Sequence, residues 1–328
     1  MLNNEPLVTF LMLSFNSRDY VRSALNAAFE QSYNNLEIIV ADDCSTDDTC
    51  ELVKRMFADY AGNKSCKIIA NSENKCTLNN FISAAESASG EVIVVSAADD
   101  MSRPNRVSEI VTQWLRNGRP GVVYSDCEII DESGVVVSDS FLSQSQSPSS
   151  MAKSIFDVRR NDILGCSAAY SAEFVRQVPR ISGRYLFEDS YMNFMSHYLN
   201  VNVLFISDSL VGYRSHGDSV SNSRLSLRRA GSEIEQQLRA AIYDRNKGEM
   251  FSCIALIAEA DGNYDVARRT AEHAKKYHIK SEWSEYGLFK RASLIFGFGD
   301  TALKKWMLFR FFGLRFFVFS KSLVGFLR

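Results

Sequence analysis

The chain has 328 residues, of which 46% are hydrophobic and 23% charged, as is ordinary for a folded globular protein. Its formal net charge is −2, so no bulk positive field favours binding to nucleic acid. The seven cysteines are odd in number and include no CxxC pair, which disfavours a disulfide framework or a zinc site and fits a reducing compartment.

Short apolar runs alternate with helix-like stretches over the first third of the chain. The predicted strands are Leu7–Leu13, Leu36–Ala41, Lys67–Ala70, Val92–Ser96 and Gly121–Tyr124. The predicted helices span 18–31, 47–60, 77–88 and 103–117. This alternation requires crossover connections, so it predicts an α/β fold with a mostly parallel sheet and flanking helices. The first run has no basic segment before it, so we interpret it as a strand and not as a signal peptide.

The second half of the chain has a different pattern. A Ser-rich loop is predicted at 138–150, and helices mixed with short strands follow up to 222. The rest reads as helical, with predicted helices at Leu225–Arg245, Met250–Ala260, Tyr264–Tyr277 and Ser281–Phe296. The turn sequence Asp261-Gly262-Asn263 predicts a helical hairpin. We therefore expect one domain at 1–222 and a helical extension at 223–328.

The first acidic pair, Asp42-Asp43, follows the second predicted strand. In open α/β sheets, ligands bind at the carboxyl ends of the strands. A carboxylate at that position can accept the N–H of a uracil-like base. The other interpretation is a helix N-cap cluster that includes Ser45, Thr46 and Asp47.

The second acidic pair, Asp99-Asp100, follows the fourth predicted strand. Two adjacent carboxylates repel each other unless a counter-charge is present. Mg²⁺ or Mn²⁺ is a suitable counter-charge, since such ions bind one or two carboxylates together with substrate phosphates. The pair could also form a solvated turn ahead of the helix that begins near Pro104.

The third acidic pair, Glu188-Asp189, lies among aromatic and apolar residues. Such surroundings would raise the pKa of one carboxyl and are typical of a functional cleft. The other interpretation is an exposed first turn of a helix, where acids favour the helix dipole. Further along, the segment YRSHGDSVS carries Arg214, His216 and Ser219. A lone histidine is usually structural, but one that follows a strand, with Arg and Ser nearby, could contact a diphosphate or complete a metal shell.

The order and spacing of these segments resemble those of the family 2 glycosyltransferases. The matching pieces are VTFLMLSFN, SRDYVRSALNAAFEQSY, NLEIIVADDCSTDDT, GEVIVVSAADDMSRPNRV, EDSYMNF and YRSHGDSVS. The resemblance implies a Rossmann-like GT-A fold and inverting transfer from a nucleotide-diphosphate sugar. It assigns nucleotide contacts to Ser14, Phe15, Asn16, Asp42, Asp43 and Asp99, with Asp43 reading the base and Asp99 near the ribose. It also assigns metal ligation to Asp100 with His216, the catalytic base to Asp189, and diphosphate or acceptor contacts to Glu188, Arg214 and Ser219.

The chain departs from the family pattern at two positions. Many members have an acid two residues before Asp99, where this chain has Ala97. This leaves Asp100 as the main ligand for a divalent cation, Mg²⁺ or Mn²⁺. Many members also have an arginine six residues after the base, where this chain has Met195. That difference weakens the match of the helix but leaves the base in place.

The segment 301–328 is basic and aromatic and contains no acidic residue. Its charges recur too often for a spanning helix, which needs about 20 mostly apolar residues. Basic and phenylalanine side chains fall on opposite sides of a helical wheel, which is typical of an interfacial amphipathic helix; packing on protein is the other interpretation. With the family resemblance, this predicts a cytoplasmic enzyme on the inner face of the cell membrane. A saccharide or lipid-linked acceptor in bacterial polysaccharide assembly would follow, with a UDP-sugar as donor.

The alternative functions are a dinucleotide-dependent oxidoreductase, a glycoside hydrolase and a catalytically silent scaffold. Residues 297–302 match GxGxxA, but no strand and no acid follow them as a dinucleotide site requires. A glycoside hydrolase also uses paired carboxylates, but it should ignore UDP. A catalytically silent scaffold with the same fold is disfavoured by the presence of Asp43, Asp100 and Asp189.

Overall fold

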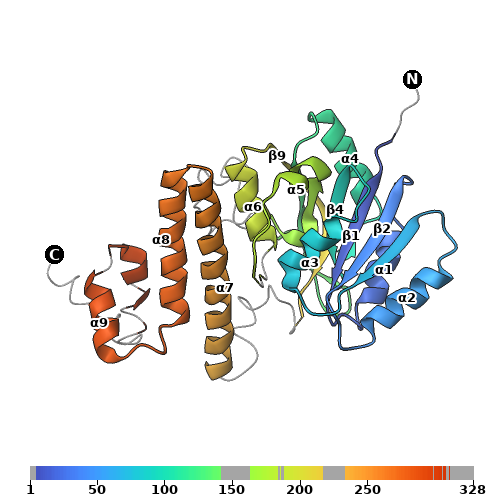
Figure 1. Cartoon of the computed structure of the whole chain (residues 1–328). Helices are drawn as coiled ribbons and strands as arrows, with labels where there is room; N and C mark the ends of the chain where they lie inside the picture. The colour runs from blue at the N-terminus through green and yellow to red at the C-terminus, as the bar shows by residue number, and fades with distance from the viewer. Residues whose placement is uncertain are drawn as a thin grey trace. The chain divides into compact units, whose positions relative to one another are not determined.

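The structure is a computed structural model that describes residues 5–141, 163–183, 185, 188–216, 233–297, 299–304, 306, 307 and 310 (Figure 1). The chain divides into two compact units, Met1–Gly231 and Ser232–Arg328. The strands of the first unit are β1 (Val8–Ser14), β2 (Leu36–Asp42), β3 (Ser65–Ala70), β4 (Val92–Ala97), β5 (Met101–Ser102), β6 (Val122–Ile130), β7 (Val136–Ser138), β8 (Ala168–Ser171) and β9 (Val203–Arg214). Its helices are α1 (Val21–Phe29), α2 (Thr49–Asp59), α3 (Cys76–Ala85), α4 (Arg106–Arg116), α5 (Ala172–Gln177), α6 (Glu188–Tyr198) and the 3₁₀ turn η2 (Gly165–Ser167).

The strands of the described residues form one sheet in the order β3-β2-β1-β4-β8-β6-β9-β5, with β7 paired to β6. The α/β fold class is confirmed, and the four strands β3, β2, β1 and β4 are parallel as predicted. Beyond β4 the sheet is mixed. β8 runs antiparallel to both β4 and β6, whereas β6 and β9 are parallel. This reversal brings the start of β8 to the carboxyl end of β4.

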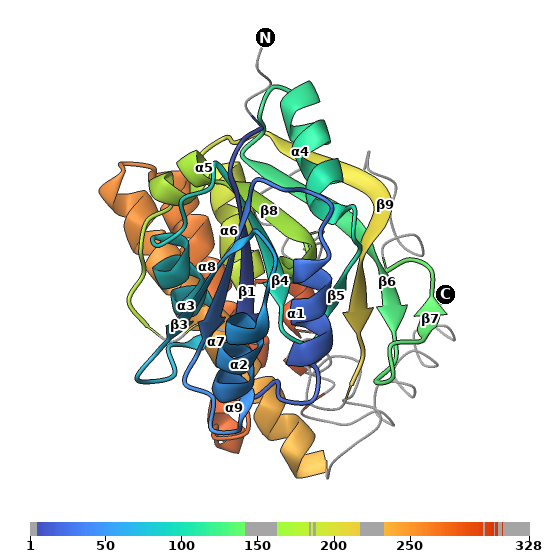
Figure 2. The ribbon, with the colours of Figure 1, turned by 90° about the vertical axis from the view of Figure 1, so that its right-hand side faces the viewer.

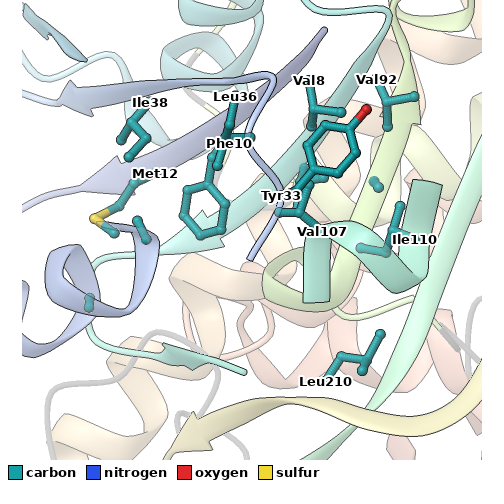
Figure 3. Close-up of a cluster of buried hydrophobic side chains, with 14 of the residues drawn as sticks. Val8, Phe10, Met12, Tyr33, Leu36, Ile38, Val92, Val107, Ile110 and Leu210 are labelled. Carbon is teal, nitrogen blue, oxygen red and sulfur yellow. The ribbon is translucent and has the colours of Figure 1, made fainter. Parts of the chain in front are cut away.

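Apolar side chains cover both faces of the sheet, which explains the nearly continuous apolar sequence of β1 and β4. On one face, Val8, Phe10 and Met12 of β1 pack with side chains from α1, α2 and α4 (Figure 3). Figure 2 looks onto this face, with α1 and α2 in front of the strands. On the other face, Phe81 of α3 contacts Tyr170 of β8 edge-on, with ring centroids 5.6 Å apart.

The second unit contains α7 (Glu233–Ala260), α8 (Tyr264–Ser281) and α9 (Leu288–Gly297). The turn between α7 and α8 is confirmed: Gly262 has φ +74°, and the Asn263 side chain caps α8. The prediction of separate helices at Leu225–Arg245 and Met250–Ala260 is wrong where the structure describes the chain, because α7 continues through both. Gly248 does not break α7. It lets the ring of His278 approach so closely that a Cβ on Gly248 would lie 3.0 Å from it.

Among the helices of the described ranges, none has the length and apolarity needed to cross a bilayer. Three predicted features lie wholly or mainly outside the described residues: the Ser-rich loop from 142 onwards, the candidate contact Ser219, and the amphipathic segment beyond residue 310.

Candidate active site

The loops after β1 and β2 are bound to each other. The Asn16 backbone N–H donates to Ser45 Oγ at 2.9 Å, and the Thr46 N–H donates to Asn16 Oδ1 at 2.8 Å. Asn16 has φ +48°, a left-handed conformation that asparagine tolerates. Phe15 is 48% exposed at this edge, whereas the Ser14 hydroxyl is buried and has no hydrogen-bond partner within the described ranges. Of these residues, only Phe15 presents a large exposed face to a ligand.

Asp42 and Asp43 make different contacts although they are adjacent and both buried. Both carboxylate oxygens of Asp42 accept hydrogen bonds from Ser45, at 2.9 Å and 2.6 Å, so Asp42 closes the turn after β2. Asp43 instead reaches the loop after β3. Its Oδ1 accepts from the Lys75 N–H at 2.7 Å and from Asn71 Nδ2 at 3.0 Å. Asp43 is therefore the member of the pair directed toward neighbouring loops.

Arg214, at the end of β9, connects the second acidic pair to the residues that follow β6. Its N–H donates to Asp100 Oδ1 at 2.8 Å, and its Nε donates to the Asp99 carbonyl at 2.7 Å. Its Nη1 donates to the carbonyl oxygens of Asp131 and Glu132. Two residues further on, His216 Nε2 lies 3.0 Å from Asp99 Oδ2. The structure thus brings together four residues that were predicted from the sequence: Asp99, Asp100, Arg214 and His216.

Asp100 is buried, and its carboxylate lacks the solvation that an ion normally has. Burial, followed by the charge of Asp99, raises the pKa of Asp100 well above its usual range. The fully buried Arg106 opposes this effect. Arg106 donates to Ser102 Oγ at 2.9 Å and to the Val95 carbonyl at 2.7 Å, and burial lowers its pKa to about 10.

The third acidic pair begins α6, as the helix-start interpretation requires, but its glutamate is buried. Burial, and then the charge of Asp189, raises the pKa of Glu188 to about 8. Gly165 makes room for this carboxyl, because a Cβ on Gly165 would lie 1.9 Å from Glu188 Oε1. Asp189 is partly exposed, and its Oδ1 accepts the Ser190 N–H. Of the two acids, Asp189 is the one open to solvent.

The turn η2 links the second and third acidic pairs. An added Cβ on Gly165 would lie 3.6 Å from the Cβ of Asp189. The thiol of the next residue, Cys166, is close enough to the Asp100 carboxyl to lower its pKa, against the larger effect of burial. Because η2 precedes β8 at the carboxyl end of β4, Asp100 and Asp189 lie at the same edge of the sheet. Asp43 follows β2, two strands from β4 at that edge.

The edge of the sheet that carries Asp43, Asp99, Asp100 and Asp189, the acidic edge, has groups that suit a divalent cation. Within the part of the chain that the structure describes, no three His, Cys, Asp or Glu side chains lie close enough to hold a metal by themselves. Asp99, Asp100 and His216 nevertheless offer oxygen and imidazole ligands, and a cation would relieve the repulsion between the adjacent carboxylates. Mg²⁺ and Mn²⁺ take water and phosphate oxygens for the remaining positions.

Three residues of this edge were not predicted from the sequence: Tyr20, Asn71 and Arg106. Arg106 had a visible signal, because it lies four residues before Ile110 on the apolar stripe of α4. Asn71 directly follows β3, so its place at the carboxyl end of a strand was also visible. Tyr20 lies in the segment SRDYVRSALNAAFEQSY of the family resemblance, but its contacts are with Arg214 and His216, far along the chain, so its place at this edge was not visible in the sequence.

The mixed sheet with its flanking helices is a fold of the GT-A type. The family model described as "Glycosyl transferase family 2" matches residues 9–178, and the chain belongs to that family.

The sequence relatives are glycosyltransferases by name. An uncharacterized glycosyltransferase of Haemophilus influenzae is 31% identical over 131 residues, 40% of each chain. The putative glycosyltransferase EpsE of Bacillus subtilis is 30% identical over 134 residues, 41% of this chain and 48% of EpsE. The putative teichuronic acid biosynthesis glycosyltransferase TuaG of B. subtilis is 25% identical over 51% of this chain and 62% of TuaG. The chain thus spans less than half the length of the first two relatives.

Two solved structures share the fold. The mannosyltransferase PcManGT of Pyrobaculum calidifontis, solved with GDP-Man and Mn²⁺, has a TM-score of 0.53 at 16% identity, over 93% of this chain and 84% of PcManGT. Staphylococcus aureus TarS 1–349, solved with UDP, has a TM-score of 0.50 at 15% identity, over 85% of this chain and 92% of that one.

Proposed function

We propose that the protein transfers a glycosyl group from a nucleotide-diphosphate sugar to an acceptor hydroxyl. The observation that supports this most is the position of Asp43, Asp100 and Asp189, which come from distant segments to one edge of the sheet. In open α/β folds this edge is where ligands bind.

The nucleotide lies between Phe15 and Asp43 in this proposal. Phe15 offers an exposed aromatic face, and Asp43 offers a carboxylate for a base N–H. Asp99 takes the ribose, and Asn16 and the turn closed by Asp42 shape the loops around it. We propose UDP as the nucleotide, since TarS was solved with UDP. GDP is the alternative nucleotide, since PcManGT was solved with GDP-Man.

Asp189 acts as the general base, and the reaction inverts the anomeric carbon. The partly exposed Asp189 carboxylate accepts the proton of the acceptor hydroxyl as the hydroxyl oxygen bonds to the anomeric carbon of the donor sugar. The bond from that carbon to the diphosphate oxygen breaks, and the nucleoside diphosphate leaves with the bonding electrons. A base in this position contributes about 10²–10⁴-fold to the rate.

Asp100 and His216 are the residues that would hold Mg²⁺ or Mn²⁺ at this edge. A bound cation supplies charge neutralisation for the departing diphosphate. Arg214 fixes Asp100 through its N–H and adds a buried positive charge behind the pair.

The acceptor is a saccharide or lipid-linked saccharide of a bacterial cell-surface polysaccharide in this proposal, as the name of TuaG suggests. A contact of segment 301–328 with the inner face of the cell membrane remains a prediction. Truncation at Thr301 tests it: the protein should move from the membrane fraction to the soluble fraction.

A thermal-shift panel tests the donor class. UDP, GDP and dTDP sugars are each added with and without Mn²⁺, and UDP with Mn²⁺ should raise the melting temperature most. A ligand at about 100 times its Kd stabilises the fold by about 2.7 kcal/mol. If no nucleotide stabilises the protein while an oligosaccharide alone does, a hydrolase becomes the better interpretation.

A further inference from the structure

Tyr20, in the loop before α1, contacts Arg214 and His216 at the acidic edge. Its ring centroid lies 4.7 Å from that of His216, with the planes tilted by 40°. The Arg214 guanidinium carbon lies 5.0 Å from the Tyr20 ring centroid. One aromatic side chain from the loop before α1 therefore contacts Arg214 and His216, which bind Asp100 and Asp99.

The Tyr20 ring adds aromatic packing to the hydrogen bonds that hold Arg214 and His216. The guanidinium of Arg214 donates within its own plane to main-chain carbonyls. A planar cation of this kind also packs its face on an aromatic ring. The imidazole of His216 meets Asp99 Oδ2 through its Nε2 and packs against the Tyr20 ring.

We propose that Tyr20 is a positioning residue, whose ring face holds His216 against Asp99 and Arg214 behind Asp100 before the donor binds. This inference rests on the proposed function. It assigns to Tyr20 no contact with the donor itself, only the orientation of the residues that meet the diphosphate and its cation.

Two substitutions separate the ring from its hydroxyl. Tyr20→Phe keeps the aromatic face, whereas Tyr20→Leu keeps an apolar side chain and removes the face. The affinity for UDP is measured by calorimetry with and without Mn²⁺. Since a displacement of about 1 Å in a site can cost about 10²-fold, we expect Tyr20→Leu to lose about 10-fold or more of the Mn²⁺-dependent affinity. Tyr20→Phe should stay within about twofold of the wild type.

A double-mutant cycle with His216→Gln isolates the contact. Because Tyr20 contacts both His216 and Arg214, Tyr20→Leu should cost less affinity in the His216→Gln background than in the wild type, and the remaining loss is the part that acts through Arg214. Additive losses would overturn the proposal, as would a Tyr20→Phe variant that is as weak as Tyr20→Leu. Wild-type affinity in Tyr20→Leu would overturn it as well.

A spectroscopic measurement keeps this test separate from the proposed function. The chain has four histidines, so ¹³C-labelled imidazole signals can be assigned by His216→Gln. Without nucleotide, Tyr20→Leu should shift the His216 signal through loss of the ring current and leave His273 and His278 unmoved. An unmoved His216 signal overturns the inference. A shifted signal in a protein that binds no nucleotide contradicts the proposed function alone.

Discussion

The backbone N–H of Arg214 donates a 2.8 Å hydrogen bond to Oδ1 of Asp100, which lies 114 residues earlier in the chain. This bond occupies one oxygen of Asp100 and leaves the carboxylate fixed at the end of β4. The candidate cation ligand is thus held by a strand on the other half of the sheet.

Asp100→Asn should remove the stabilisation that UDP gains from Mn²⁺. The amide keeps an oxygen for the Arg214 N–H but removes the charge that attracts a divalent cation. Thermal shifts with UDP, with and without Mn²⁺, measure the effect. Asp208→Asn, an exposed position on β9, is the matched control and should behave like the wild type. An unchanged Mn²⁺ response in Asp100→Asn would remove Asp100 from the cation site.

Asp189→Asn should lower kcat by about 10²-fold or more, because the amide cannot accept the acceptor proton. The affinity for UDP should stay within about twofold, since Asp189 takes no part in nucleotide binding in this proposal. Steady-state kinetics and calorimetry measure the two quantities. Glu173→Gln, exposed on α5, serves as the control. Near-wild-type turnover in Asp189→Asn would exclude Asp189 as the base.

Glu188 should make the folded state less stable as the pH rises. Its ordinary pKa is 4.5, and in the folded protein the value is about 8. Its contribution to stability is therefore fully present below about pH 4.5 and is lost as the pH rises through 8, by about 1.4 kcal/mol per unit. The free energy of unfolding of the wild type, measured by denaturation from roughly pH 5 to 9, should fall relative to that of Glu188→Gln as the pH rises.

The Asp189→Asn variant sharpens that measurement. The Asp189 charge is the second cause of the raised Glu188 pKa, after burial. Its removal should move the loss of stability to lower pH without abolishing it. Wild-type and Glu188→Gln curves that stay parallel would show that Glu188 titrates normally.

Arg106→Met should destabilise the first unit by about 2–5 kcal/mol. The change leaves the Val95 carbonyl and the Ser102 hydroxyl without their buried donor, and Asp100 without an opposing charge. Urea denaturation measures the free energy of unfolding. Arg116→Met, an exposed position on the same helix, should change it by less than about 0.5 kcal/mol.

Gly165→Ala should lower both stability and turnover. The new methyl group would overlap the Glu188 carboxyl, and overpacking of this kind costs about 1–3 kcal/mol. Displacement of Glu188 would also disturb Asp189 on the same turn of α6. Gly287→Ala is the control, because its added Cβ would meet no atom within 4 Å. Equal stability in the two variants would show that Glu188 moves aside freely.

Local pattern was sufficient for the first half of the fold. The strands β1 to β4 and helices α1 to α3 lie within a few residues of their predicted positions, because each has its own apolar periodicity and its own turn residues. The continuity of α7 was not predictable in this way. Gly248 normally weakens a helix, and only the packing of His278 against it accounts for its position.

The sequence by itself determined the α/β class, the family pattern and the positions of the acidic pairs at strand and helix ends. It could do so because these features depend on residues close together in the chain. Only the tertiary structure separated Asp42, which closes a turn, from Asp43, which reaches Asn71. Only it placed Arg106 and Tyr20 beside the acidic edge, because those contacts join segments that the sheet brings together from distant parts of the sequence.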